Sequence, residues 1–332
     1  MANRTSCLLV ALAAAAAVSG AHAQSRYGNI DIYGRINLSY ENQKTTRHTN
    51  VMQDNASRWG IVGEENISSD VSAIFNLESG FNADNGMNKD PAASFDRESW
   101  VGLASKKFGT LRMGATTSPV YYAAADYVSM HNHDTGTSSD ALFGFDATGG
   151  HLTNMTAYKT PAFNDATVEV AYALAEKSGG RSVVNVAYNQ DIKALHVGAG
   201  YAQSKDRGVS NSTDTMYVVR ALYDITDALA AGGYWEYDKY DQQGHRNNLR
   251  GAVKYTVGAN EFHVNVGYTN GFSKTEDNGA LQWTLGYNYN LSPRTKVYAF
   301  YTRIDNEKNA SYGVDEAGVN FASFAVGLRH NF

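Results

Sequence analysis

Alternation of apolar and polar residues is the dominant pattern along this chain. Residues 28–40, GNIDIYGRINLSY, place apolar side chains at the even positions from Ile30 to Tyr40, with only Gly34 interrupting them. The odd positions carry Asn29, Asp31, Tyr33, Arg35, Asn37 and Ser39. Because successive strand residues point to opposite faces, this stretch predicts a strand with one apolar and one polar face. It is longer than the usual ~5–6 residues of a strand.

The same pattern recurs to the C-terminus. It is clear in the segments 71–81, 166–174, 182–190, 194–204, 215–225, 247–257, 261–272, 281–291, 295–304 and 318–332. Together with the less sharply bounded stretches between them, we count sixteen strands. An even number of strands is what a closed antiparallel bacterial barrel requires.

Short and long connections alternate between these strands. The short turns lie near residues 67–69, 106–108, 164–165, 190–193, 225–227, 258–260 and 291–294. The long polar loops lie near residues 41–55, 82–95, 176–180, 205–214, 239–246, 273–279 and 306–317. One end of the sheet therefore carries tight turns and the other long loops, as in outer-membrane barrels. A soluble β-sandwich is the alternative for such strands, but it has no reason to alternate short and long connections along the whole chain.

Tyrosines gather near the predicted strand ends, as the aromatic girdles of membrane barrels do. They are Tyr40, Tyr158, Tyr188, Tyr201, Tyr237, Tyr287 and Tyr289, and Phe332 ends the last strand. The composition of 22 Tyr, 31 Gly and 4 Pro agrees with many strands and few interruptions. The sequence predicts an all-β transmembrane antiparallel barrel of sixteen strands, set in the outer membrane.

The N-terminus reads as a secretory signal over residues 1–23. Arg4 precedes the apolar run LLVALAAAAAV, and Ala21-His22-Ala23 forms a small-residue cleavage site before Gln24. The run is too short for a transmembrane helix, which needs about 20 apolar residues. We expect residues 24–332 to form a single domain without a thiol, since Cys7 is the only cysteine. The net charge of −5 argues against nucleic acid as a partner.

Residues 115–150 form the longest stretch without strand alternation. Residues 116–150 contain no Lys or Arg but four aspartates, and loops of this length are usually functional. We expect the stretch to fold into the barrel as a constriction loop, lined by Asp126 and Asp134, then Asp140, with Asp146 near the exit. Strand parity predicts that Arg35, Arg58, Arg97, Arg112, Glu64 and Glu78 point into the lumen.

Several motifs resemble the general porins of Gram-negative outer membranes, in their β-proteobacterial branch. They are IDIYGRI at 30–36, SRWGIVGEEN at Ser57–Asn66, AIFNLESGFNADNG at Ala73–Gly86, RESWVGLASKKFGTLRMG at Arg97–Gly114, NMTAYKTPAF at Asn154–Phe163, YNYNLSPRTKVYAFYTR at Tyr287–Arg303, and the final GLRHNF. The resemblance implies a homotrimer of sixteen-stranded barrels that passes small hydrophilic solutes and ions without a cofactor. It also implies that the third external loop, 115–150 here, folds inward with acidic side chains facing a basic ladder.

The chain departs from the family pattern at four positions where such porins commonly carry a basic residue. These are Val62, Ala115, His151 and Ala157. The implied basic ladder is therefore thinner than usual. The acidic loop favours a weak cation preference and the arginines oppose it, so the sequence leaves the sign of selectivity open.

Besides passive diffusion, three functions stay open at this stage. A substrate-specific channel of the same fold is favoured by Tyr121, Tyr122 and Tyr127, whose rings could stack on a solute. The second is an outer-membrane enzyme, although the sequence contains no catalytic serine motif. The third is an adhesive surface protein. His131 and His133 lie beside Asp134 without a third ligand, so we expect no metal site there.

Overall fold

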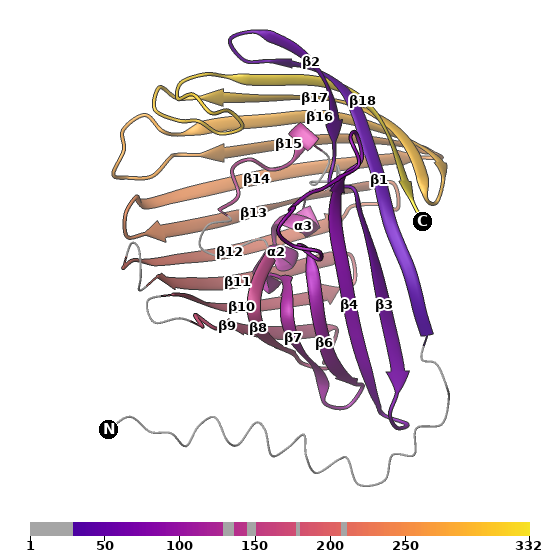
Figure 1. Ribbon diagram of the computed structural model, residues 1–332. Helices are drawn as coiled ribbons and strands as arrows, with labels where there is room; N and C mark the ends of the chain where they lie inside the picture. Colours follow the sequence, from indigo (N-terminus) through magenta and orange to yellow (C-terminus); the bar gives the residue numbers. More distant parts are fainter. Residues whose placement is uncertain (1–28, 129–135, 145–150, 177–179, 207–210) are drawn as a thin grey trace.

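The computed structural model is a closed antiparallel β-barrel (Figure 1). It describes residues 29–128, 136–144, 151–176, 180–206 and 211–332. The predicted signal, residues 1–23, lies outside the described residues. Among the described residues, no helix is long and apolar enough to cross a membrane.

The strands and helices follow one another along the barrel wall. The first strands are β1 (Asn29–Lys44), β2 (His48–Asp54), β3 (Arg58–Asn66), β4 (Val71–Asn82), β5 (Met87–Asn88), β6 (Glu98–Ser105) and β7 (Gly109–Thr117). Three short helices follow, α2 (Pro119–Ala123), α3 (Ala125–Val128) and the 3-10 helix η1 (Gly136–Ser138). The remaining strands are β8 (His151–Lys159), β9 (Ala166–Ala173), β10 (Arg181–Ile192), β11 (Leu195–Asp206), β12 (Thr213–Asp224), β13 (Leu229–Tyr240), β14 (Gly244–Val257), β15 (Asn260–Thr269), β16 (Ala280–Ser292), β17 (Thr295–Asn306) and β18 (Phe321–Asn331).

The barrel wall has sixteen strands, as predicted. The eighteen labels reduce to sixteen because β2 and β3 together form one wall strand and β5 lies in a loop. β2 pairs with the second half of β1 and β3 with the first half, so they continue one another along the wall. Between them Ala56 has a φ of 59°, a left-handed conformation that interrupts the strand. β5 pairs only with β4. Pairing of β1 with β18 closes the cylinder.

The two faces of the wall differ as the alternation predicts. On β1, Ile30 and Ile32 are 60% and 69% exposed, whereas Asn37 and Glu41 are fully buried. The same contrast holds on β14, where Leu249 is 52% exposed and Asn248 only 1%. Apolar side chains thus cover the outside, which suits contact with lipid, and polar side chains point inward.

Connection lengths also follow the predicted alternation of short and long, with two differences. The expected long loop at residues 239–246 is a tight turn, because β13 ends at Tyr240 and β14 begins at Gly244. The expected loop at residues 41–55 is mostly strand, because β1 and β2 continue to Lys44 and from His48. Only Thr45–Arg47 separate them. Residues 41–54 read ENQKTTRHTNVMQD, which lacks an apolar face. Beyond the lipid both faces of a strand meet water, so the hydrophobic alternation that reveals a strand disappears there.

Candidate functional site

The β7–β8 connection spans residues 118–150, and its described parts, residues 118–128 and 136–144, lie against the inside of the barrel wall. Figure 1 shows α2 and α3 within the cylinder. At its start, the Ser118 hydroxyl donates to Asn185 Oδ1 on β10 at 2.6 Å. At the end of α2, Arg220 Nε on β12 donates to the Ala123 carbonyl at 2.6 Å. The apolar side of this stretch packs on the wall in one buried cluster that includes Val120, Ala124, Val128, Met216 and Val218.

The middle of the connection is fixed by Asp140. Its carboxylate lies 3.1 Å from Arg250 Nη1 on β14 and accepts a hydrogen bond from the Tyr234 hydroxyl on β13. Asp140 is 9% exposed and Arg250 4%. Asp140 therefore pairs with Arg250 and not with an arginine of the predicted lumen set, and its place in the constriction stays a prediction. Arg250 neutralises this aspartate, which fixes the connection to the wall.

A second buried group holds the residues after Asp140. Glu236 on β13 accepts hydrogen bonds from the Gly144 amide at 3.0 Å and from Asn248 Nδ2 at 2.6 Å. Asn248 and Arg246 both donate to the Leu142 carbonyl, at 2.8 and 3.1 Å. Arg246 also pairs with Asp238 at 2.8 Å. Breaking such buried charge pairs is costly, so this part of the connection is firmly attached.

Two further wall residues, Gln282 and Glu41, bond to the connection. Gln282 on β16 donates to the Ser139 carbonyl at 2.7 Å and accepts from the Ala141 amide at 3.0 Å. The Thr137 hydroxyl of η1 donates to Glu41 on β1 at 2.8 Å. The described part of the connection is thus bonded to β1, β10, β12, β13, β14 and β16, well around the circumference.

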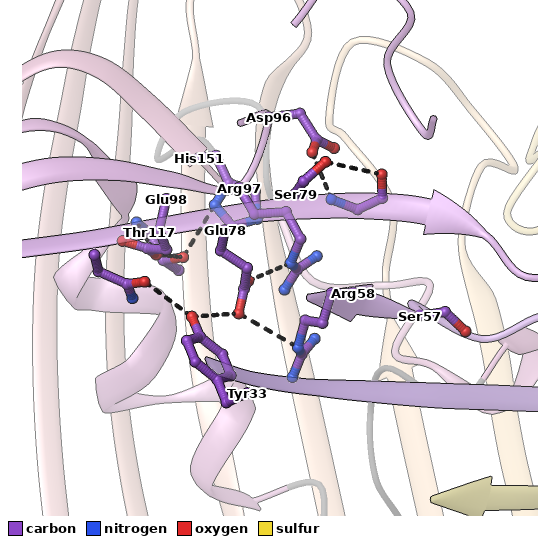
Figure 2. Close-up of polar contacts among 12 residues, drawn as sticks. Tyr33, Ser57, Arg58, Glu78, Ser79, Asp96, Arg97, Glu98, Thr117 and His151 are labelled. Carbon is purple, nitrogen blue, oxygen red and sulfur yellow. Dashed lines mark hydrogen bonds and ion pairs between the residues drawn. The ribbon is translucent and has the colours of Figure 1, made fainter. Parts of the chain in front are cut away.

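Arg58, Arg97 and Glu78 come together on the inner wall (Figure 2), with Arg58 on β3, Glu78 on β4 and Arg97 directly before β6. Arg97 Nε lies 2.5 Å from Glu78 Oε1, and Arg58 Nε lies 3.7 Å from Glu78 Oε2. The Tyr33 hydroxyl donates to the same carboxylate at 2.9 Å. Arg35 is the cross-strand partner of Arg58. We call Arg35, Arg58, Arg97 and Glu78 the basic wall cluster; its three guanidinium groups outnumber its single carboxylate.

Glu98, the first residue of β6, and His151, the first residue of β8, lie beside the basic wall cluster (Figure 2). Glu98 accepts hydrogen bonds from Trp100 Nε1 at 2.7 Å and from the Thr117 hydroxyl at 2.7 Å. That hydroxyl also lies 3.0 Å from His151 Nδ1. These contacts tie both ends of the connection to the wall that carries the arginines.

The other predicted wall residues lie apart from this cluster. Arg112 on β7 pairs with Glu169 on β9, so its charge is locally balanced, and its guanidinium lies 5.3 Å from the Trp100 ring centre. Glu64 is exposed near the short-turn end of β3. Ala157, which replaces a basic residue of the family pattern, lies opposite Arg112 in the register and is 1% exposed.

Several candidate residues of the connection are only partly described. Asp134, Asp146, His131 and His133 lie outside the described residues, as do the side chains of Asp126 and Tyr127 in α3. In the part of the chain that is described, no group of three metal-ligating side chains occurs. Tyr121 packs against Phe143, with ring centres 6.1 Å apart. Tyr122 is 47% exposed.

The sequence did not single out the wall residues that hold the connection. They are Glu41, Asn185, Arg220, Glu236, Asp238, Arg246, Asn248, Arg250 and Gln282. The available signal was that each is a polar residue at a strand position that points into the barrel, on the face opposite the exposed apolar side chains.

Comparison with known proteins identifies this architecture. The family model described as Gram-negative porin matches residues 11–309. An outer membrane porin protein of Bordetella pertussis is 24% identical over 84% of this chain and 83% of its own length. Outer membrane porin protein 32 of Delftia acidovorans is 26% identical over 98% of this chain and 99% of its own length.

Solved structures agree on the fold. The anion-selective porin from Comamonas acidovorans superposes with a TM-score of 0.79 at 23% identity, covering 92% of this chain and all of that one. The trimer form of OmpT from Vibrio cholerae superposes with a TM-score of 0.72 at 16% identity, covering 92% of this chain and all of that one. The barrel fold is therefore shared with outer-membrane porins.

Proposed function

The chain belongs to the Gram-negative porin family, whose members are outer-membrane channels, and we propose that it passes small hydrophilic solutes and ions by passive diffusion. The β7–β8 connection narrows its water-filled lumen and selects solutes by size. The inner arginines add selection by charge. Family membership also sets aside the enzyme and adhesive alternatives, since a porin acts as a channel.

The observation that carries this proposal is the bonding of the β7–β8 connection around the inside of the wall. Contacts from Ser118 to Asn185, from Thr137 to Glu41 and from Ala141 to Gln282 reach widely separated strands. A chain held at such separated points occupies part of the barrel's cross-section. Fixed charges act most strongly on ions where a pore is narrow.

The described charges favour a weak preference for anions. The basic wall cluster carries three guanidinium groups against Glu78, with the carboxylate of Glu98 beside it, whereas Asp140 of the connection is paired with Arg250. Arg112 is balanced by Glu169 and adds little. The similar porin of Comamonas acidovorans is named anion-selective, which agrees with this sign.

We further propose that residues 1–23 are removed as an export signal and that three copies assemble. The Vibrio cholerae OmpT structure is described as a trimer form, which supports the second point. The apolar outer wall, with side chains such as Val326 and Leu328 more than half exposed, offers area for contact with lipid or with another copy.

Planar-bilayer recordings test the function directly. Purified protein in detergent should insert as conducting units that close in three equal steps at high voltage. In a KCl gradient, the reversal potential should have the sign of a modest anion preference. Protein that inserts with its native circular dichroism but never conducts would contradict the channel, and closure in a single step would contradict the trimer.

A further inference from the structure

A polar pocket lies at the long-loop end of the barrel, above the β7–β8 connection. Its volume is about 360 Å³, and its floor includes Ala141, Phe143 and Gly144 of the connection. Its sides come from the external connections that follow β13, β15 and β17. The pocket is thus open to the outside and rests on the part of the connection that Glu236 and Gln282 hold in place.

Neutral hydrogen-bonding side chains line this pocket. They are Gln243, Asn278, Asn309 and Ser311. A carboxamide offers both donors and acceptors, and a hydroxyl can act as either, so such a set matches the hydroxyl groups of a neutral solute. Four aromatic residues also line the pocket, namely Tyr240, Phe272, Phe143 and Tyr312, and the ring centres of Tyr240 and Phe272 are 4.9 Å apart.

The charge of the pocket is balanced. Arg246 is the only charged side chain among the described lining residues. Its guanidinium pairs with Asp238 at 2.8 Å, donates to the Tyr312 hydroxyl at 2.8 Å and lies over the Phe272 ring at 4.6 Å. A guanidinium held in this way contributes a hydrogen-bonding edge and little net attraction for an anion.

We propose that this pocket binds neutral hydroxylated ring solutes, mono- or disaccharides in chemical class, before they pass through the channel. The volume falls in the ~300–1,000 Å³ range of small-molecule sites, and amide groups beside aromatic rings suit a ring with hydroxyl edges and a less polar face. Tyr121 and Tyr122 of the connection are not among the residues that line it. The inference rests on the proposed channel function and names a solute class for it.

Saturable block of the channel current by maltose tests the proposal. Maltose added on the long-loop side should reduce the conductance along a saturating curve, since a bound sugar lies over the connection. In Gln243→Ala, the half-blocking concentration should rise about threefold, as expected for the loss of one neutral hydrogen bond. The neighbouring variant Gln242→Ala is the matched control, because Gln242 is exposed and is not a lining residue.

The outcomes separate this inference from the channel itself. Saturating block in the native protein and in Gln242→Ala, weakened in Gln243→Ala, supports the site. A conductance that falls only in proportion to the viscosity of the sugar solution would overturn the inference while leaving the channel intact. Equal half-blocking concentrations in both variants would also overturn it. Absence of any conductance would instead refute the proposed function.

Discussion

Replacing Arg35, Arg58 and Arg97 together with glutamine should move the channel's ion selectivity toward cations by about tenfold. A unit charge about 8 Å from a permeating ion contributes ~0.5 kcal/mol even at the dielectric constant of water, so three charges contribute ~1.5 kcal/mol. Glutamine can still donate a hydrogen bond to Glu78, whose carboxylate also accepts one from Tyr33 at 2.9 Å. The readout is the reversal potential in a KCl gradient.

Salt dependence and a control arginine variant test whether the shift comes from the charges of the basic wall cluster. The effect should be largest in dilute KCl, because the Debye length is about 10 Å at 0.1 M and shorter in concentrated salt. Arg303 lies on the outward parity of β17 and pairs with Asp305 at 2.6 Å. Arg303→Gln should leave the reversal potential unchanged. An equal shift in this control, or none in the triple variant, would show that the basic wall cluster does not act on permeating ions.

Deleting residues 119–149, so that β7 and β8 are joined by a short turn, should raise the single-channel conductance about fourfold. Conductance through a narrow aqueous zone follows its cross-section, so a loop that halves the radius lowers the conductance by about this factor. The deletion exposes Arg220, Glu236 and Gln282, which are buried against the connection, to the water of the lumen. Conductance in symmetrical KCl measures the change.

Folding of the deletion variant needs its own check. The wall strands pair with one another along their whole length, so the barrel does not depend on the connection for its hydrogen bonds. Far-ultraviolet circular dichroism in detergent should therefore match the native protein. Shortening the connection after β15 by residues 273–277, which are exposed, is the matched control and should leave the conductance near its native value. An unchanged conductance in a folded deletion variant would mean that the connection does not narrow the lumen.

Most of the fold could be predicted from the sequence because a membrane barrel imposes a period of two on every strand. Lipid outside and water inside select opposite residue types, as on β1 with Ile32 and Asn37. The rule fails where the environment is the same on both faces. The strands therefore extend past Glu41 into stretches that were expected to be loop, and the interruption at Ala56 left no trace in the pattern.

The site could be predicted in part for the same reason. Parity placed Arg35, Arg58, Arg97 and Glu78 on the inward face, and the structure brings these four together. Parity carries no information about which loop residue meets which wall residue. Asp140 pairs with Arg250, 110 residues further along the chain, and no local pattern encodes such a contact. The role of the cluster in selectivity stays a prediction.

The central claim is that the β7–β8 connection lines the path of permeating ions, and a single cysteine at Tyr122 tests it most directly. Tyr122 is 47% exposed, and the only native cysteine, Cys7, lies in the predicted signal. A bulky methanethiosulfonate reagent added to Tyr122→Cys during a recording should cause a lasting fall in single-channel conductance. Thr275→Cys, in an external connection, should react without such a fall. If mass spectrometry showed Tyr122→Cys fully modified while its conductance stayed at the native value, the claim would be contradicted.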